Sequence, residues 1–578
     1  MKRLCIILLF FTQGAFAQNI FKAVVQDAKT GEKLSGVAVK LKGSQIGAAS
    51  DSAGIVGLSN IPTGSRTLSF TYVGYDRLEQ TFNFPLPAGD TVRTIRLNPA
   101  ADELDVVTVT STRTNSRIEN LPVKVEVLGR EDMEEENQVK PASVASILGD
   151  LSVIHVQQTS AVTGNTVIRM QGLDGKYTQL LRDGLPLYDG FSGNFGILSI
   201  PPLDLKQIEI IKGSVSTLYG GGAIAGMINF ISKTPSAVPE LSLTLNRSTL
   251  KENNANVYYA QRYGRFGLTM LAQQTLQNAV DVNKDGFSDV AKVRNTILHP
   301  RLFYTIDSAT KIDAGYAYTH ENRIGGDMQA IAGGSSAAHP YFEGNFSNRH
   351  TADLHFQHET DSTYRLTVKG SYSNYAQRSS EPGFLLNASQ TSDYLEVNNL
   401  IRAGKHELVL GANYTGESFR KGSTTGVFFN DYTYHTLGAF AQDGWQIAPK
   451  FLIETGLRAD HHNTFGWFIL PRIALFYHAN EALSVRLSSG LGYKAPNLFT
   501  SETLAGSLQN LLPVNLGTKS ERSAGVNFDV NYHFMIGDKL SVDIDQALYY
   551  THISNPITPV INTDQTVSLN NAPFHIRS

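Results

Sequence analysis

The chain of 578 residues has almost no cysteine, and its charges nearly balance. Its single cysteine is Cys5, so disulfides and cysteine-ligated metals are excluded from residues 6 to 578. The formal net charge is −3, and no basic excess of the kind that binds nucleic acid is present. After the N-terminal segment, no stretch offers the ~18 consecutive apolar residues of a membrane helix. We therefore exclude disulfide-stapled, nucleic-acid-binding and helical membrane proteins.

The N-terminal segment has the pattern of an export signal. Lys2 and Arg3 precede an apolar run over residues 4–11, and Ala15-Phe16-Ala17 provides a small-x-small cleavage site before Gln18. We expect residues 1–17 to be a signal peptide that is removed on export, together with Cys5. An exported chain without a membrane helix is either soluble or a β-barrel.

Residues 20–98 are predicted to form a small β-sandwich. Short alternating segments are separated by turns roughly every 8–12 residues, which is typical of this architecture. The stretch VVQDAKTGEKLSGVAVKLKG, followed by Asp51-Ser52-Ala53-Gly54 and Tyr72-Val73-Gly74-Tyr75, resembles the carboxypeptidase-regulatory-like domain. The resemblance implies no peptidase, because no His-Glu metal-binding pair accompanies it. We expect a periplasmic module that positions or relays.

Three motifs follow one another between residues 168 and 231. They are Leu181-Arg182-Asp183-Gly184, the strand end Ile208-Glu209-Ile210-Ile211-Lys212-Gly213, and Leu218-Tyr219-Gly220 leading to Gly226-Met227-Ile228-Asn229. In this order and spacing they resemble the plug domain of TonB-dependent outer-membrane receptors. An unrelated soluble α/β domain with glycine turns is the alternative. The resemblance implies a plug over residues 121–234 and a gated importer. It also implies that the chain is not an enzyme, and no supported nucleophile or phosphate-loop motif speaks against that.

The linker over residues 99–120 contains a candidate TonB box. Its members are Asp105, Val106, Val107, Thr108, Val109 and Thr110. Alternating β-branched residues in a tether can pair with an exposed sheet edge, which is how an energising partner would grasp them. The alternative is a last strand of the preceding sandwich. By resemblance, the partner is the TonB–ExbB–ExbD complex.

Residues 236–578 alternate apolar and polar residues over long segments. Residues 241–246 and 366–373 are examples, and similar stretches recur to residue 487. With flanking residues they approach the ~9–11 residues of a tilted transmembrane strand. A soluble sandwich or propeller could also alternate. The predicted fold class is mainly β: a small β-sandwich, then an α+β plug domain inside a transmembrane antiparallel β-barrel.

The length of this last region limits the number of strands. The family resemblance implies a barrel of about 22 strands. At ~10 residues per strand plus loops, residues 236–578 provide only about fourteen to sixteen strands. The chain also stops at residues 574–578 in what reads as a loop. We therefore expect a C-terminally incomplete piece of a longer receptor; a smaller closed barrel is the alternative.

Ligand contacts are expected from the apical loops of the plug, as the family layout implies. The candidates are Gln158, Tyr188, Phe191, Asn194 and Phe195. No cofactor is expected to be required.

A second candidate site has the spacing of a calcium loop. Asp281, Asn283, Asp285 and Asp289 place oxygen ligands at positions 1, 3, 5 and 9, with glycine at position 6. Lys292 replaces the usual glutamate at position 12, so the loop is not an EF-hand. We predict Ca²⁺ in an extracellular loop, with a simple solvated loop as the alternative.

Together these features predict an active importer in the outer membrane of a Gram-negative bacterium, with the sandwich in the periplasm. Its expected partners are the TonB complex, outer-membrane lipid and a small-molecule ligand, and no nucleic acid. A ferric siderophore is the commonest cargo in the family; cobalamin, haem and other metal chelates are alternatives. A non-transporting adhesion or surface-structural β-protein is the rival from another class.

Overall fold

The computed structural model describes residues 19–578 except 29–30, 32, 45, 73–74, 76–77, 88–91, 99–107, 115, 119–120, 161, 194, 481, 501–502, 505–507, 516 and 537–539. The chain divides into two compact units between residues 106 and 107. The predicted signal peptide, residues 1–17, lies outside the described residues.

The first unit consists of two small sheets packed face to face. In one sheet β1 (Asn19–Asp27) lies between antiparallel β4 (Ile55–Ile61) and parallel β7 (Arg93–Leu97). The other has the order β3 (Gly47–Ala49), β2 (Ala38–Leu41), β5 (Gly64–Thr71), β6 (Leu78–Phe84). Alternate residues of these strands point inward, and Phe21, Phe70 and Phe82 meet at the centre. The unit is therefore a β-sandwich.

The second unit begins with a small α+β domain, here called the plug. Its five-stranded sheet has the order β10 (Val125–Leu128), β15 (Leu205–Lys212), β16 (Gly226–Ser232), β13 (Thr178–Arg182), β14 (Leu185–Pro186). A hairpin of β11 (Ile154–Gln158) and β12 (Thr166–Met170) lies beside it, with helices α1 (Arg130–Val139), α2 (Ala145–Gly149) and α3 (Ser216–Tyr219). Strands β15 and β16 are largely buried on both faces, which explains why apolar residues occupy both faces of these strands.

At one position of the plug motifs the backbone geometry requires glycine. Gly226 begins β16 with φ +143°, and a Cβ atom there would lie 2.2 Å from the carbonyl oxygen of Ile211. Only glycine allows this close approach of the two central strands.

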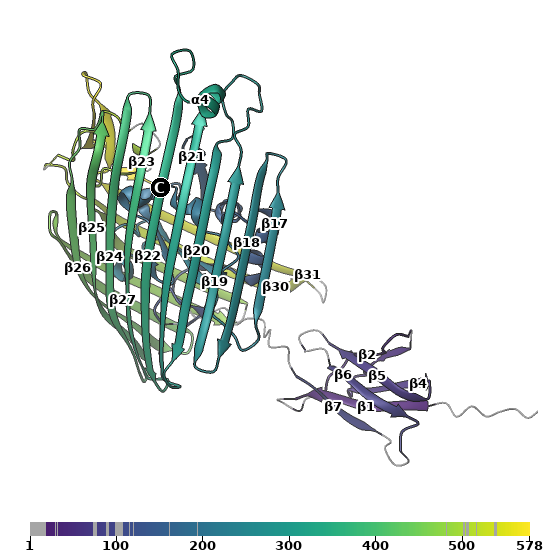
Figure 1. Ribbon diagram of the computed structural model, residues 1–578. Coiled ribbons are helices and arrows are strands. Elements are labelled where there is room, and N and C mark those ends of the chain that lie inside the picture. Colours follow the sequence, from purple (N-terminus) through teal and green to yellow (C-terminus); the bar gives the residue numbers. More distant parts are fainter. Residues whose placement is uncertain are drawn as a thin grey trace, which may run out of the picture. The chain divides into compact units, whose positions relative to one another are not determined.

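The rest of the second unit is one long antiparallel sheet, here called the barrel sheet (Figure 1). Its strands follow in chain order: β17 (Glu240–Arg247), β18 (Glu252–Tyr263), β19 (Phe266–Gln277), β20 (Lys292–Thr305), β21 (Thr310–Gly326), β22 (Phe342–Thr360), β23 (Tyr364–Glu381), β24 (Phe384–Ala403), β25 (His406–Thr425), β26 (Tyr432–Ala448), β27 (Phe451–His462), β28 (Gly466–Asn480), β29 (Leu483–Lys494), β30 (Glu521–Ile536), β31 (Leu540–Ser554) and β34 (Ile576–Arg577).

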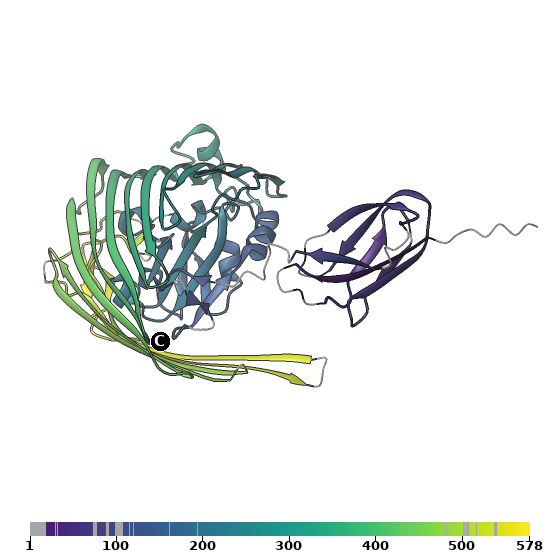
Figure 2. The same ribbon diagram turned by 90° about the horizontal axis from the view of Figure 1, so that it is seen from below.

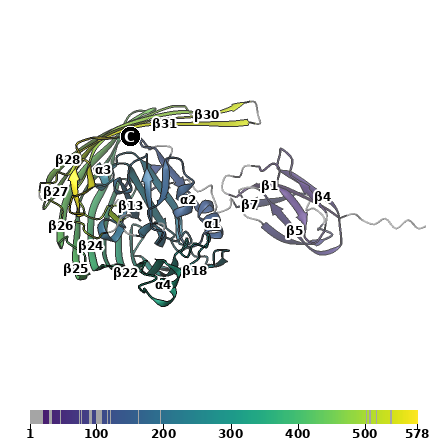
Figure 3. The same ribbon diagram turned by 90° about the horizontal axis from the view of Figure 1, so that it is seen from above.

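Within the described residues the sheet contains sixteen strands, which confirms the expected fourteen to sixteen. In the described part of the chain, β17 and β34 are its two ends, and no ladder joins them. The sheet curves around the plug, as Figures 2 and 3 show from below and above. Among the described residues, no helix is both long and apolar enough to span a membrane.

The two faces of the barrel sheet differ in chemistry. On β17 every second residue is exposed on the outer face, and Leu241, Leu243 and Leu245 occupy these positions. On the inner face polar and charged residues alternate with them, as Asn256 on β18 and Gln273 on β19 show. An apolar outer band around a polar interior is the pattern of an outer-membrane strand.

The two ends of the sheet differ as well. At one end the connections are tight, such as residues 264–265 between β18 and β19 and residues 404–405 between β24 and β25. At the other end lie the longer loops 278–291, 327–341 and 495–520; the second carries α4 (Met328–Gly333). Short turns face the periplasm and long loops face outward in such proteins, so the long-loop end is the extracellular end. A two-stranded hairpin, β32 (Ile557–Ile561) and β33 (Val567–Asn571), also belongs to the loops.

Candidate functional site

Buried ion pairs attach the plug to the barrel sheet. Arg301 on β20 contacts the plug residue Asp183 at 2.6 Å, and on the wall it also contacts Asp313 at 2.6 Å and Asp353 at 3.3 Å. Burial alone raises the pKa of Asp183, but Arg301, together with His355 and Arg182, lowers it to about 2. The carboxylate is therefore charged at neutral pH, and the plug is held to the wall by a charge that water does not screen.

A second pair lies next to the first. The plug carboxylate Asp204 is bonded to Arg182 of the plug and, at 2.7 Å, to His299 Nδ1 of β20. Burial raises the pKa of Asp204, yet Arg182 and His299 bring it well below the usual value. Residues of the Leu-Arg-Asp-Gly motif therefore lie at the junction of plug and wall.

The described part of the candidate TonB box lies at the short-turn end of the barrel sheet. Asp105, Val106 and Val107 are outside the described residues, while Thr108 and Val109 form β8, which pairs with β9 (Ser116–Arg117). The side chain of Val109 is fully buried against the plug. The box itself stays a prediction.

The residues just after Val109 are bonded to the central sheet of the plug. Glu209 on β15 is fully buried, and its carboxylate accepts hydrogen bonds from the backbone N–H groups of Thr110 and Ser111, both at 2.9 Å. The hydroxyls of both residues also donate to it. Tyr219 Oη donates to the carbonyl oxygen of Ser111 at 2.7 Å. The segment is thus connected to two separate elements of the plug.

The next residues reach the barrel wall. Arg113 Nε donates to Glu396 Oε1 on β24 at 3.0 Å, and its Nη2 contacts the other carboxylate oxygen. Lys369 on β23 lies 3.6 Å from Glu396, and its Nζ donates to the carbonyl of Gly184 in the plug at 2.8 Å. Through Glu396 and Lys369, the wall therefore contacts two parts of the plug.

A cavity of about 280 Å³ lies between the plug and the inner face of the barrel sheet. Its wall lining comes mainly from β23 to β27 and β29. Its plug lining comes from residues 166–168, 175–176, 178–180, 186–190, 193, 197 and 219–222. The wall residues belong to the halves of these strands nearer the long loops. The cavity therefore lies on the extracellular side of the plug, where a ligand from outside would arrive.

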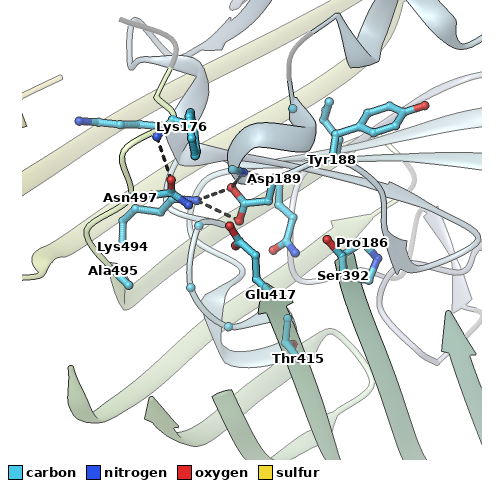
Figure 4. Close-up of a pocket in the computed structure, with 18 of the residues that line it drawn as sticks. Lys176, Pro186, Tyr188, Asp189, Ser392, Thr415, Glu417, Lys494, Ala495 and Asn497 are labelled. Carbon is cyan, nitrogen blue, oxygen red and sulfur yellow. Dashed lines mark hydrogen bonds and ion pairs between the residues drawn. The ribbon is translucent and has the colours of Figure 1, made fainter. Parts of the chain in front are cut away.

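Charged side chains of plug and wall meet in this cavity (Figure 4). Lys494 Nζ at the end of β29 contacts both carboxylate oxygens of Asp189, at 3.1 and 3.2 Å. Figure 4 shows Glu417 of β25 and Asn497 beside this pair. The cavity is thus a polar site built from both domains.

The five predicted ligand residues occupy different environments. Tyr188 lines the cavity, and the guanidinium of Arg349 lies 4.5 Å from its ring. Gln158 is exposed, and its side chain donates to the carbonyl of Ser160. Asn194 lies outside the described residues.

The two predicted phenylalanines are buried. Phe191 packs against Tyr375, Phe419 and Phe499, with ring centroids 5.0 to 5.6 Å apart. Phe195 is 5% exposed and lies under the guanidinium of Arg323 at 5.2 Å. The cavity instead contains Glu417, Lys494 and Asn497, which sequence reasoning did not select.

The predicted calcium loop lies between β19 and β20. Asp281 accepts hydrogen bonds from the N–H groups of Lys284 and Gly286, and Asp289 accepts one from Val282. Asn283 Nδ2 donates to Asp285 at 3.0 Å. Within the described ranges, no group of three or more acidic, histidine or cysteine side chains is arranged to hold a metal ion.

Calcium in this loop stays a prediction. A melting temperature that rises with calcium in the native chain but not in Asp281→Asn would support it. No change with calcium or chelator would contradict it.

Comparison with known families matches each part of the chain in turn. Residues 22–109 match the CarboxypepD_reg-like domain, residues 117–227 the TonB-dependent receptor plug domain, and residues 299–574 the TonB-dependent receptor-like β-barrel. The plug and barrel matches together cover more than half of the chain. The chain therefore belongs to the TonB-dependent receptors, a family of outer-membrane transporters and not of enzymes.

Individual relatives are more distant. The iron-regulated outer membrane virulence protein of Vibrio cholerae is 25% identical over 411 residues, covering 66% of this chain. The chain spans 58% of the length of that relative.

Solved structures show the same fold. The siderophore receptor PirA from Acinetobacter baumannii superposes with a TM-score of 0.64 at 15% identity, over 81% of this chain and 78% of PirA. A mutant of the ferric enterobactin receptor PfeA from Pseudomonas aeruginosa gives 0.63 at 17% identity, over 81% and 78%. The ferric yersiniabactin uptake receptor FyuA from Yersinia pestis gives 0.58 at 17% identity, over 78% and 74%.

Proposed function

We propose that this chain imports a ferric chelate, most simply a ferric siderophore, across the outer membrane with energy supplied by the TonB–ExbB–ExbD complex. Family membership supports TonB-driven transport of a small molecule. The names of the relatives support the cargo: one is iron-regulated, and the structural neighbours are receptors for siderophores.

The main structural support for the proposal is one hydrogen bond made by Tyr219. Tyr219 lines the cavity on the extracellular side of the plug, and its hydroxyl bonds the backbone of Ser111, two residues after Val109. A single side chain thus connects the ligand cavity with the end of the candidate TonB box. Because Glu209 holds the same segment, we expect a force on the box to reach β15 and, through Tyr219, the adjacent Gly220–Gly222 on the cavity wall.

The buried ion pairs explain why energy is needed. The plug lies within the curve of the barrel sheet and is bonded to it through Asp183 and Arg113. Opening a path separates charges that have no access to water, and breaking one buried pair costs about 3–5 kcal/mol. Thermal motion opens such a plug rarely, whereas a mechanical pull lowers the barrier.

The test separates binding from transport. Val107→Pro removes a backbone N–H from the box and prevents strand addition to a partner. We expect this variant to bind the ferric chelate normally and to lose energised uptake in cells. The matched control Val107→Thr keeps a β-branched, strand-compatible residue and retains uptake. Normal uptake by Val107→Pro would overturn the role of the box.

A second comparison tests the cargo. A deletion strain carrying this chain is grown on different iron sources under iron restriction. We expect growth on at least one ferric chelate. Equal growth with and without the chain on every iron source would contradict iron import and direct the search to cobalamin or another chelate.

A further inference from the structure

The charges of the cavity carry information about its cargo. The charged side chains that line it are Lys176, Asp189, Glu417, Arg458, Asp460, Lys494 and Glu521. Asp393 also borders the cavity, but it follows the inward-facing Ser392 on β24, so its side chain points to the other face of the sheet. The lining therefore contains three cationic side chains and four carboxyl groups.

Each of the three cations already has a carboxylate partner. Lys494 contacts Asp189 at 3.1 Å, Lys176 contacts Glu521 at 3.1 Å, and Arg458 contacts Asp460 at 2.7 Å. The last two pairs are almost entirely buried. A ligand anion would have to separate one of these two buried pairs before it gained a positive partner, and that costs as much as it returns. Lys494 is the more accessible cation, since Asp189 is 64% exposed, and its ammonium already contacts both oxygens of Asp189.

Glu417 is the carboxylate that remains. Its carboxylate accepts a hydrogen bond from Tyr432 Oη and lies beside Asp189 and Asn497 (Figure 4). Among the described residues it forms no ion pair, since the nearby Lys494 contacts both oxygens of Asp189. The lining therefore has one more carboxyl group than it has cations.

Two further groups do not change this balance. Arg349 is not part of the lining: it lies between the rings of Tyr188 and Tyr375, at 4.5 and 4.2 Å, and donates to the carbonyl of Ser192. His462 does line the cavity, but its Nδ1 accepts the N–H groups of Thr464 and Phe465, so the ring is neutral.

The uncharged lining suits a chelate with oxygen and amide groups. Hydroxyls and amides from both domains line the cavity: Tyr188, Ser371, Ser373, Gln390, Ser392, Thr415, Tyr434, Thr436, Asn497 and Thr500. Such groups donate to or accept from neutral amides and hydroxamates without needing an opposite charge.

We propose that the cavity takes a ferric chelate that is neutral or positively charged, such as an iron trihydroxamate bearing a free ammonium group, and discriminates against a trianionic tris-catecholate. The inference rests on the proposed import of a ferric chelate and names its chemical class. Glu417 is the group that receives the positive charge, because a carboxyl group that forms no ion pair can pair with an ammonium and gives an anion no positive partner.

The experiment compares three probes of similar size on the purified full chain in detergent. They are a ferric trihydroxamate with a free ammonium, the same chelate acetylated at that amine, and a ferric tris-catecholate. We expect the cationic chelate to bind more tightly than the neutral one, and the trianion to bind at least about tenfold more weakly than either, which corresponds to ~1.4 kcal/mol. Calorimetry gives the three dissociation constants.

Variants assign the effect to the cavity. Glu417→Gln should abolish the preference for the cationic over the neutral chelate, while Asp564→Asn, the same charge change in an exposed outer loop, should leave it intact. Lys494→Gln frees Asp189 and should strengthen cation binding severalfold, so a folding failure of one variant leaves the other as a test. Tightest binding by the trianion would overturn the inference and leave the proposed function standing. Binding of none of the three would count against the proposed function itself.

Discussion

Tyr219 donates a hydrogen bond to the backbone carbonyl of Ser111 over 2.7 Å, and the same tyrosine lines the cavity on the extracellular side of the plug. The ring also lies 4.4 Å from the guanidinium of Arg113, which is bonded to Glu396 on the barrel wall. One side chain therefore contacts the ligand cavity, the segment after the candidate TonB box and a plug-to-wall bridge. This gives a short physical route by which an occupied cavity can alter the periplasmic end of the plug.

The first prediction concerns that route. Tyr219→Phe keeps the ring and removes only the hydrogen bond to Ser111. The lost hydrogen bond, worth ~1 kcal/mol, joins Tyr219 to the segment after the box and does not point into the cavity. We therefore expect ligand affinity within about twofold of the native chain. In a Thr108→Cys background, ligand should change the rate of maleimide labelling in the native chain but not in Tyr219→Phe. If ligand changed the labelling rate of Tyr219→Phe as much as that of the native chain, the route would be contradicted.

The second prediction concerns the bridge between Arg113 and Glu396. Glu396 is fully buried, so Glu396→Ala leaves the charges of Arg113 and Lys369 without a buried carboxylate. We expect this single change to weaken attachment of the plug by about 3–5 kcal/mol. The measurement is the conductance of the protein in planar bilayers under urea, where a displaced plug opens a pore. Glu135→Ala on helix α1, in an exposed position, is the control and should leave the urea midpoint unchanged.

The third prediction concerns acid. The pKa of Asp183 is lowered in the folded protein to about 2, from an ordinary value near 3.9. A carboxyl with a depressed pKa stabilises the fold fully above its unfolded pKa, and this contribution is lost as the pH falls through the folded value. For Asp183 the contribution is ~2 kcal/mol and disappears between about pH 4 and pH 2. Asp183→Asn should therefore reduce stability at pH 7 and flatten its pH dependence in that window. A native-like acid profile in the variant would contradict the assignment.

The fourth prediction concerns the apex of the plug. Phe191 packs against Phe419 of the wall and Phe499 of a long loop. Phe191→Ala leaves a cavity in this cluster, which typically costs about 3–5 kcal/mol. We expect the 495–520 loop to become more sensitive to protease while the melting of the barrel sheet is unchanged. Phe191→Leu fills most of the space and should be nearly native. Equal protease sensitivity of the alanine variant and the native chain would contradict the contact.

The sequence predicted the class and the order of the parts. Alternation such as Leu241–Asn246 marks a strand with one lipid-facing and one polar face, and this pattern is local, so it can be read from one segment. The three plug motifs lie within a short stretch and identified the family that the comparisons show. The strand number followed from length alone.

The composition of the site could not be predicted in the same way. Lys494 meets Asp189 across 305 residues of sequence, and Arg113 meets Glu396 across 283. These pairs of residues come into contact only when the sheet curves around the plug in one particular register. Phe191 and Phe195 were predicted as ligand contacts from their place in an apical loop; tertiary packing buries both side chains, and their role in binding stays a prediction. Glu417 was not selected because an isolated carboxylate on an alternating strand has no distinctive neighbours in sequence.

The most direct test of the account is the initial rate at which iron from a ferric chelate accumulates in cells that have this chain as their only receptor for that chelate. The rate is measured in matched strains with and without a functional TonB, and surface binding is measured in parallel. We predict equal binding in both strains and accumulation only where TonB is functional. Equal accumulation without TonB would contradict the central claim that the plug is opened by energy delivered through the box.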